Sequence, residues 1–183
     1  MSDLTITHAG TAITQLRPGM TSTNQRLNEM KTKVFSITPT TATAEAGANE
    51  VIFQADELAN FMSEKGGTAI IQSITLLDDN DFGETIDIVF MDTSGLLDAT
   101  SDAGSAIDVD DASSTVPASI LGVVTVSNYF DGVAWKFGQK DNIGLAIKAA
   151  STTRSVWLSA VNRGTARDWD TDGLHLKIGY IQD

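Results

Sequence analysis

The sequence predicts a mainly β fold, an antiparallel β-sandwich or jelly roll, because short apolar segments separated by polar loops follow one another from Val34 onward. Several of these segments alternate apolar and polar residues, which is typical of strands with one buried face. The 183 residues, with 42% hydrophobic content, can build one sizeable core. We therefore expect a single β-sandwich domain at residues 34–183, preceded by an extended N-terminal arm at residues 1–33.

Eight segments have the length and composition of β-strands. They are Val34–Thr38, Val51–Gln54, Ala69–Leu77, Thr85–Met91, Ser119–Val126, Ile143–Ala149, Ser155–Asn162 and Leu174–Ile181. An acidic turn, Asp78–Gly83, lies between the third and fourth segments, so we expect these two to form a β-hairpin. This layout favours a sandwich or barrel over alternating helices and strands.

The last segment shows the clearest alternation of apolar and polar residues. We expect its apolar side chains to face inward and the residues between them to face outward. The inward set is Leu174, Leu176, Ile178 and Tyr180, and the outward set is His175, Lys177 and Gly179. By the same rule Asp87 and Ser159, each between two apolar residues, should point outward.

Helical patterns are rare in the chain. Asp56–Glu64 is predicted to form one short helix, because three of its apolar residues share a face at helical spacing. A second helical turn is expected at Pro117–Leu121, since proline favours the start of a helix. The connection at residues 93–117 is rich in Asp, Ser, Ala and Gly. Its length indicates either a loop with a function of its own or a mobile loop.

The expected arm differs from the body in charge. Residues 1–33 hold four basic and two acidic residues, a balance of +2, whereas the other 150 residues hold eight basic and twenty-two acidic ones, a balance of −14. The arm has no pattern that could bury a core of its own. Fully extended, the arm can reach on the order of 100 Å, which is long enough for it to lie across a neighbouring subunit. The alternative is a terminal tail without function.

Composition excludes several classes of partner and site. The net charge of −12 opposes binding to nucleic acid, because phosphate contacts require basic residues. No apolar run approaches the roughly 20 residues that a membrane-spanning helix needs, and the first residues lack the pattern of a targeting signal. The absence of cysteine excludes disulfides, thiolate metal sites and cysteine nucleophiles.

Catalytic motifs are missing as well. The two histidines are His8, in the expected arm, and His175, on the outward side of the last strand. Neither lies in a G-x-S-x-G or H-E-x-x-H setting, and the chain has no phosphate-binding glycine motif. We therefore expect surface histidines, no enzyme activity and no cofactor.

An acidic stretch between Asp78 and Asp111 contains no basic residue. Its eleven members are Asp78, Asp79, Asp81, Glu84, Asp87, Asp92, Asp98, Asp102, Asp108, Asp110 and Asp111. Two of these carboxylates could serve as the acid and base of a glycosidase, but such an enzyme also needs a substrate cleft with aromatic platforms. The stretch offers only Phe82 and Phe90, so solvated loops are the favoured interpretation.

The run Asp168–Gly173 reproduces the D-x-D-x-D-G opening of a calcium loop, with Asp168, Asp170 and Asp172 as the candidate metal ligands. The twelfth position, where a bidentate Glu is expected, is Gly179, and the intervening residues alternate like a strand. An acidic turn before the last strand is therefore favoured over a calcium site.

The three tryptophans, Trp135, Trp157 and Trp169, are candidates for a sugar-stacking surface. Core packing or a subunit interface is the commoner use of so few large aromatic side chains. Both interpretations stay open at the level of sequence.

Six blocks of the sequence have a recognisable composition: Gly66–Asp78 (GGTAIIQSITLLD), Ile86–Asp92 (IDIVFMD), Ile120–Val124 (ILGVV), Asn142–Ala149 (NIGLAIKA), Ser155–Thr165 (SVWLSAVNRGT) and Gly173–Gln182 (GLHLKIGYIQ). These blocks resemble small structural proteins in the virions of tailed phages and prophages. They cover most of residues 50–183 in consistent order and mark strands and turns. The arm and the triplet Asp168–Asp172 depart from the pattern, so functions that rest on them are specific to this chain.

The resemblance implies a non-enzymatic virion protein, assembled in the host cytoplasm, that decorates or cements a capsid. It further implies a homotrimer whose partner is the major capsid protein or another virion protein. Acidity suits an outer virion surface that must stay soluble at high local density. Alternatives are a tail, baseplate or fibre-anchoring protein, a carbohydrate-binding β-sandwich module and, less favoured, a glycosidase.

Overall fold

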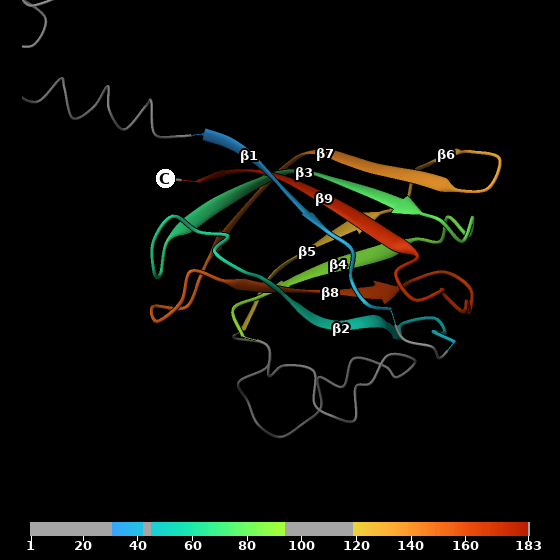
Figure 1. Cartoon of the computed structure of the whole chain (residues 1–183), viewed down its shortest axis with the longest axis horizontal. Helices are drawn as coiled ribbons and strands as arrows, with labels where there is room; N and C mark the ends of the chain where they lie inside the picture. Colours follow the sequence, from blue (N-terminus) through green and yellow to red (C-terminus); the bar gives the residue numbers. More distant parts are fainter. Residues whose placement is uncertain (1–30, 42–44, 94–118, 183) are drawn as a thin grey trace, which may run out of the picture.

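The alternating segments form nine β-strands in the part of the chain that the computed structural model describes, residues 31–41, 45–93 and 119–182 (Figure 1). The strands are β1 (Lys31–Ile37), β2 (Val51–Leu58), β3 (Thr68–Asp78), β4 (Ile86–Met91), β5 (Ile120–Val126), β6 (Tyr129–Asp131), β7 (Lys136–Lys148), β8 (Val156–Asn162) and β9 (Leu174–Gln182). Residues 1–30 of the expected arm and most of the connection at residues 93–117 lie outside this part.

The strands pack as two antiparallel sheets face to face. One sheet has the order β1-β9-β3-β7-β6 and the other the order β2-β8-β4-β5. Along the chain, the strands from β1 to β4 alternate between the two sheets, and the strands from β7 to β9 alternate again. This is the strand order of a jelly roll, which confirms the predicted fold class.

The expected hairpin between the third and fourth predicted segments is wrong. β3 pairs with β7 and β9, whereas β4 pairs with β5 and β8 in the opposite sheet. The acidic turn Asp78–Gly83 therefore carries the chain from one sheet to the other. The prediction failed because β3 pairs with strands far along the chain, β7 and β9, and local turn chemistry does not show this.

The helix predicted at Asp56–Glu64 is also wrong. Residues up to Leu58 belong to β2 and pair with β8, and Asn60 has a positive φ of 55°, in the turn that follows the strand. The apolar side chains of Leu58, Phe61 and Met62 are buried as expected, but they reach the core from a strand end and a turn. Pairing with β8 outweighs the helical spacing of these residues.

Three other predicted elements need adjustment. The described part of the helical turn expected at Pro117–Leu121 includes Ile120 and Leu121, which begin β5. The segment expected at Ile143–Ala149 is the end of a longer strand, β7, and β6 has no counterpart in the prediction. The remaining predicted strands match observed strands to within a few residues.

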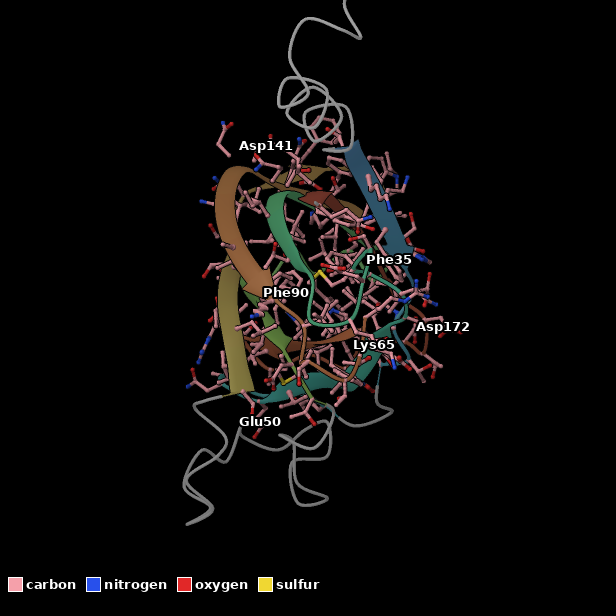
Figure 2. The ribbon with its side chains drawn as sticks, turned by 90° about the vertical axis from the view of Figure 1, so that its left-hand side faces the viewer. Phe35, Glu50, Lys65, Phe90, Asp141 and Asp172 are labelled. Atoms are coloured by element: carbon pink, nitrogen blue, oxygen red, sulfur yellow. The ribbon has the colours of Figure 1, made fainter. Side chains whose placement is uncertain are left out.

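The core fills the space between the sheets (Figure 2), where Phe90 is fully buried. The four predicted inward residues of β9 are at most 4% exposed, and the Tyr180 ring stacks on Phe61 with centroids 4.0 Å apart. Of the predicted outward residues, His175 is partly exposed and Lys177 is exposed, but Gly179 is buried. A Cβ at Gly179 would lie 2.4 Å from Ser73 Oγ, so the Ser73 side chain covers this glycine.

The part of the outer face of the four-stranded sheet that β4 and β8 form is buried too. Asp87 and Ser159 lie on this face as predicted, yet they are only 8% and 0% exposed. Val89, Met91 and Val161 on the same face form a second, smaller apolar cluster. The expected exposure was therefore wrong, because alternation reports which face a residue takes and not whether that face meets water.

Candidate functional site

The predicted calcium loop lies at one end of the sandwich, next to the connection between β3 and β4. Asp168, Asp170 and Asp172 are all exposed, and Figure 2 shows Asp172 at the periphery of the molecule. Asn80 Nδ2 donates a hydrogen bond to Asp170 Oδ2 at 2.8 Å. The Asp170 carbonyl accepts hydrogen bonds from Thr41 Oγ1 at 2.5 Å and from the Gly173 N–H at 2.9 Å.

These contacts tie the loop into the fold as a turn. Asp172 has a positive φ of 64°, so the backbone bends sharply just before Gly173 and β9. Within the described residues no group of three or more His, Asp or Glu side chains is arranged to hold a metal ion. The calcium site stays a prediction from the sequence, and the geometry supports the acidic turn.

The acidic stretch divides into structural and solvated carboxylates. Asp78 is fully buried at the end of β3, where its carboxylate accepts hydrogen bonds from the N–H groups of Asn80, Phe82 and Gly83 at 3.0, 3.2 and 3.0 Å. Burial raises the pKa of Asp78, while these hydrogen bonds lower it and leave a net rise. Asp78 therefore shapes the crossing between the sheets.

Asp87 is the second buried carboxylate of the stretch. Its two oxygens accept hydrogen bonds from Thr125 Oγ1 at 2.5 Å and from Arg163 Nε at 2.6 Å. The expectation of solvated loops was wrong for Asp78 and Asp87, because each has replaced water with protein donors. Asp79 and Asp81 are exposed as expected, and the acidic residues from Asp98 to Asp111 lie outside the described part.

Glu84 links the same end of the molecule to the β8–β9 connection. Its carboxylate accepts hydrogen bonds from the Thr165 N–H, from Thr165 Oγ1 and from Arg167 Nε, the last at 2.7 Å. Burial raises the pKa of Glu84, but the Thr165 and Arg167 contacts outweigh it and lower that pKa overall. The charge of Glu84 thus stabilises the connection.

His175 lies in a chain of polar contacts that the sequence did not indicate. Its Nδ1 is 2.9 Å from Thr38 Oγ1, and its Nε2 is 2.9 Å from Asp79 Oδ2. A hydroxyl, an imidazole and a carboxylate in this order are the components of a nucleophilic triad. The side chains of His175 and Asp79 are 39% and 50% exposed, however, so water competes for both contacts, whereas triads act where water is excluded. We interpret these polar contacts of His175 as a structural link between three segments of the protein.

The three tryptophans have different environments. Trp169 is 2% exposed and packs edge-on against Phe82, with ring centroids 5.6 Å apart. Trp157 is half-buried in the second apolar cluster. Trp135 is 38% exposed and lies against the exposed ring of Phe130, with centroids 6.0 Å apart. Core packing therefore accounts for two tryptophans, and Trp135 belongs to a surface.

That surface is part of an uneven distribution of exposed apolar side chains. Six large apolar residues of the described part are strongly exposed, and only Val123 lies on the four-stranded sheet. The other five are on the five-stranded sheet or its β6–β7 hairpin: Val34, Ile70, Phe130, Val133 and Trp135. Exposed apolar residues that cluster on one face mark an interaction surface.

The first cluster, the hairpin corner, consists of Phe130, Val133 and Trp135, which are 66%, 100% and 38% exposed. Residues 132–135 form the turn between β6 and β7, and the Gly132 N–H donates to the Trp135 carbonyl at 2.9 Å. The hairpin projects at one end of the molecule (Figure 1). This hairpin was not among the predicted elements, although the Asp-Gly pair at the end of β6, flanked by aromatic residues, is a hairpin signal.

The second cluster, the β1 corner, consists of Val34, Ile70 and Ile181 from three neighbouring strands. Thr32, Ile181 and Ile70 lie side by side in the register, and Val34 is opposite Gly179. Val34 is 65% exposed, Ile70 37% exposed and Ile181 half-buried. Because these residues come from positions far apart in the chain, no local pattern could have predicted this corner.

Comparison with known proteins yields structural likenesses of low sequence identity. No protein-family model matches the chain, and neither does any curated protein. A chain in the crystal structure of tomato aspermy virus is 10% identical, with 84% of this chain and 77% of that chain covered and a TM-score of 0.40. A chain of Desmodium yellow mottle tymovirus is 11% identical, with coverage of 84% and 81% and a TM-score of 0.27. The fold assignment therefore rests on the strand order.

No helix of the described residues has the length and apolar character that crossing a membrane requires.

Proposed function

We propose that the chain is a non-enzymatic structural protein of a tailed-phage virion that decorates the capsid shell as a homotrimer. The observation that carries this proposal is the jelly roll with its exposed apolar side chains gathered on one sheet. Jelly rolls are common in viral capsids, and exposed apolar clusters serve association. The resemblance of the strand segments to small virion proteins supports the same role. The partner is the major capsid protein, and assembly takes place in the host cytoplasm.

The polar clusters support a structural role over catalysis. Asp78 caps three backbone N–H groups, Asp87 pairs with Arg163, and Glu84 pairs with Arg167. Each of these carboxylates is occupied by contacts that hold loops in place. A glycosidase would instead need two carboxylates facing a common substrate space.

Localisation on the virion is the direct test. Purified protein is added to particles that lack it, and the particles are imaged and reconstructed. We expect additional density at regular positions on the head, with an equal number of copies at each equivalent site. Density at the tail or baseplate would favour the tail or fibre-anchoring alternative, and unchanged particles would contradict a virion role.

Trp135 and Phe130 are the observation that favours the carbohydrate-binding alternative, since exposed aromatic rings can stack on sugars. A glycan array separates the two functions. Binding to a defined glycan that is lost in Trp135→Ala would support the module, and the proposed capsid role predicts no glycan binding.

The N-terminal arm is proposed as the main attachment to the capsid. Lys31 and Lys33 belong to β1, so residues 1–30 hold two basic and two acidic residues, and this neutral segment can approach partners that repel the acidic body. Since β1 begins at Lys31, the deletion that keeps the sheet intact removes residues 1–30. We expect this variant to fold with an unchanged melting temperature and to lose capsid binding.

The matched control carries residues 1–30 in reversed order, which keeps length and charge. It should also fail to bind, because attachment by strand addition depends on the sequence of the arm. Full occupancy by the deletion variant would show that the arm is a passive tail and that the body makes the attachment.

A further inference from the structure

The two apolar corners lie on the same outer face of the five-stranded sheet, at opposite edges. β1 forms one edge of this sheet and β6 the other. Phe130 is opposite Phe137, and Phe137 is opposite Leu77. The hairpin corner therefore extends along the outer face toward the middle of the sheet over these two half-buried residues, Phe137 and Leu77. Figure 1 shows the β6–β7 hairpin at one end of the molecule and the start of β1 near the other end. The corners are therefore diagonal to each other.

The net charges beside the corners have opposite signs, with one exposed carboxylate, Asp141, in the register row that contains Val34. Two exposed lysines lie near the β1 corner. Lys177 is two residues from Gly179, which pairs with Val34. Lys148 is two residues from Ala146, which pairs with Ile70. Neither lysine forms an ion pair with another described residue. The hairpin corner is flanked by Asp131 and Asp81, which share the single cation of Lys136.

The row between the corners is polar. Ser36, Lys177, Thr75 and Gln139 lie side by side across four strands in the register. If two copies met face to face, this row would be buried against itself, and its polar groups would lose water. The opposed lysines would also repel each other. An edge contact that joins one corner of each copy avoids both costs.

We propose that the hairpin corner of one copy packs on the β1 corner of a second copy, in a head-to-tail contact that closes into a ring of three. Phe130, Val133 and Trp135 then cover Val34, Ile70 and Ile181 of the neighbour. Asp81 and Asp131 approach the two unpaired lysines, so the rim is complementary in charge. A head-to-tail contact repeats around a ring, which leaves neither corner exposed. This contact specifies the self-association within the proposed function.

Three valine-to-aspartate variants test the contact by native mass. Val133→Asp alters the hairpin corner, Val34→Asp alters the β1 corner, and Val123→Asp is the matched control at the exposed valine of the other sheet. The unaltered protein and the control should have the mass of three chains. Each corner variant should have the mass of one chain. An equal mixture of both corner variants should give a dimer, because one intact hairpin corner meets one intact β1 corner.

Crosslinking tests the pairing of the corners directly, since the chain has no cysteine of its own. A double variant with Val133→Cys and Val34→Cys should oxidise to a covalent trimer. The control with Val123→Cys and Val34→Cys should remain uncrosslinked.

The contact would be overturned if the unaltered protein were a monomer at the highest concentration at which it stays monodisperse, or if it were a dimer. It would also be overturned if all three aspartate variants changed the native mass equally. Failure of this inference is distinguishable from failure of the proposed function. A monomer that still decorates particles refutes the head-to-tail contact and the trimer but keeps the decorating role, and a trimer that binds no virion refutes the decorating role but keeps the contact.

Discussion

The structure predicts a large and pH-dependent effect of replacing Asp78. The carboxylate is fully buried and accepts three backbone hydrogen bonds in the loop that carries the chain between the sheets. A hydrogen bond to a charged group contributes about 1.5–3 kcal/mol, so three bonds set an upper limit of about 9 kcal/mol. Water can reach the half-buried donors after truncation, and removal of the charge recovers its desolvation cost. We therefore expect Asp78→Ala to lower the free energy of unfolding by about 2–4 kcal/mol.

The matched variant is Asp78→Asn, which keeps one carbonyl oxygen as an acceptor at the same place. It should lose less, about 1–2 kcal/mol, because one oxygen can still accept from two neighbouring N–H groups. Urea denaturation at neutral pH gives both values from the midpoint and slope. Unchanged stability in Asp78→Ala would refute the structural role of this carboxylate.

The pH dependence tests the balance between burial and hydrogen bonding at Asp78. Its pKa in the folded state is raised above the ordinary 3.8, so the folded protein binds this proton more readily than the unfolded chain. The stability that Asp78 contributes should therefore increase as pH falls from neutral through the raised pKa toward 3.8. The destabilisation caused by Asp78→Asn should grow over the same range. If it shrinks instead, the three N–H groups outweigh desolvation and the pKa is lowered.

Three further predictions concern packing, charge and metal binding. Gly138→Ala should lower the free energy of unfolding by about 1–3 kcal/mol, measured by urea denaturation, because a Cβ there would lie 2.7 Å from atoms of Tyr129 and Val126. The control Gln139→Ala, at the next and exposed position, should leave this free energy unchanged. Glu84→Gln should lower the free energy of unfolding above pH 4.5, and this difference should be lost as pH falls through the lowered pKa of Glu84. A difference that persists in acid would contradict the ion pair with Arg167. Millimolar calcium should leave the melting temperature nearly unchanged, and a large rise that disappears in Asp170→Ala would establish the site.

Residue patterns along one strand predicted the local structure well. Alternation in β9 correctly assigned Leu174, Leu176, Ile178 and Tyr180 to the core, because each strand of a sandwich has one face toward the other sheet. The pairing of strands was not predictable in this way. β3 is bonded to β9, about a hundred residues further along the chain, and that choice depends on how all nine strands pack together.

The candidate site shows the same division. The hairpin corner is encoded within six consecutive residues, Phe130–Trp135, and the Asp-Gly pair would have revealed it. Two sets of contacts join segments that are distant in sequence. His175 contacts Thr38 and Asp79, and Asp87 is buried beside Arg163. Such contacts leave no local pattern, since each residue alone is compatible with an exposed position.

One irregularity in β3 explains how both corners come to lie on one face. Ile70 and Leu77 are an odd number of residues apart, so a regular strand would point them to opposite faces. The register of β3 shifts between Ile71 and Ser73 against both β7 and β9. This bulge lets Ile71 and Ile74, three residues apart, both reach the core, and both are fully buried. Ile70 and Leu77 consequently share the outer face, where they support the β1 corner and the hairpin corner. The bulge thus makes a single sheet surface with two ends that can meet between copies.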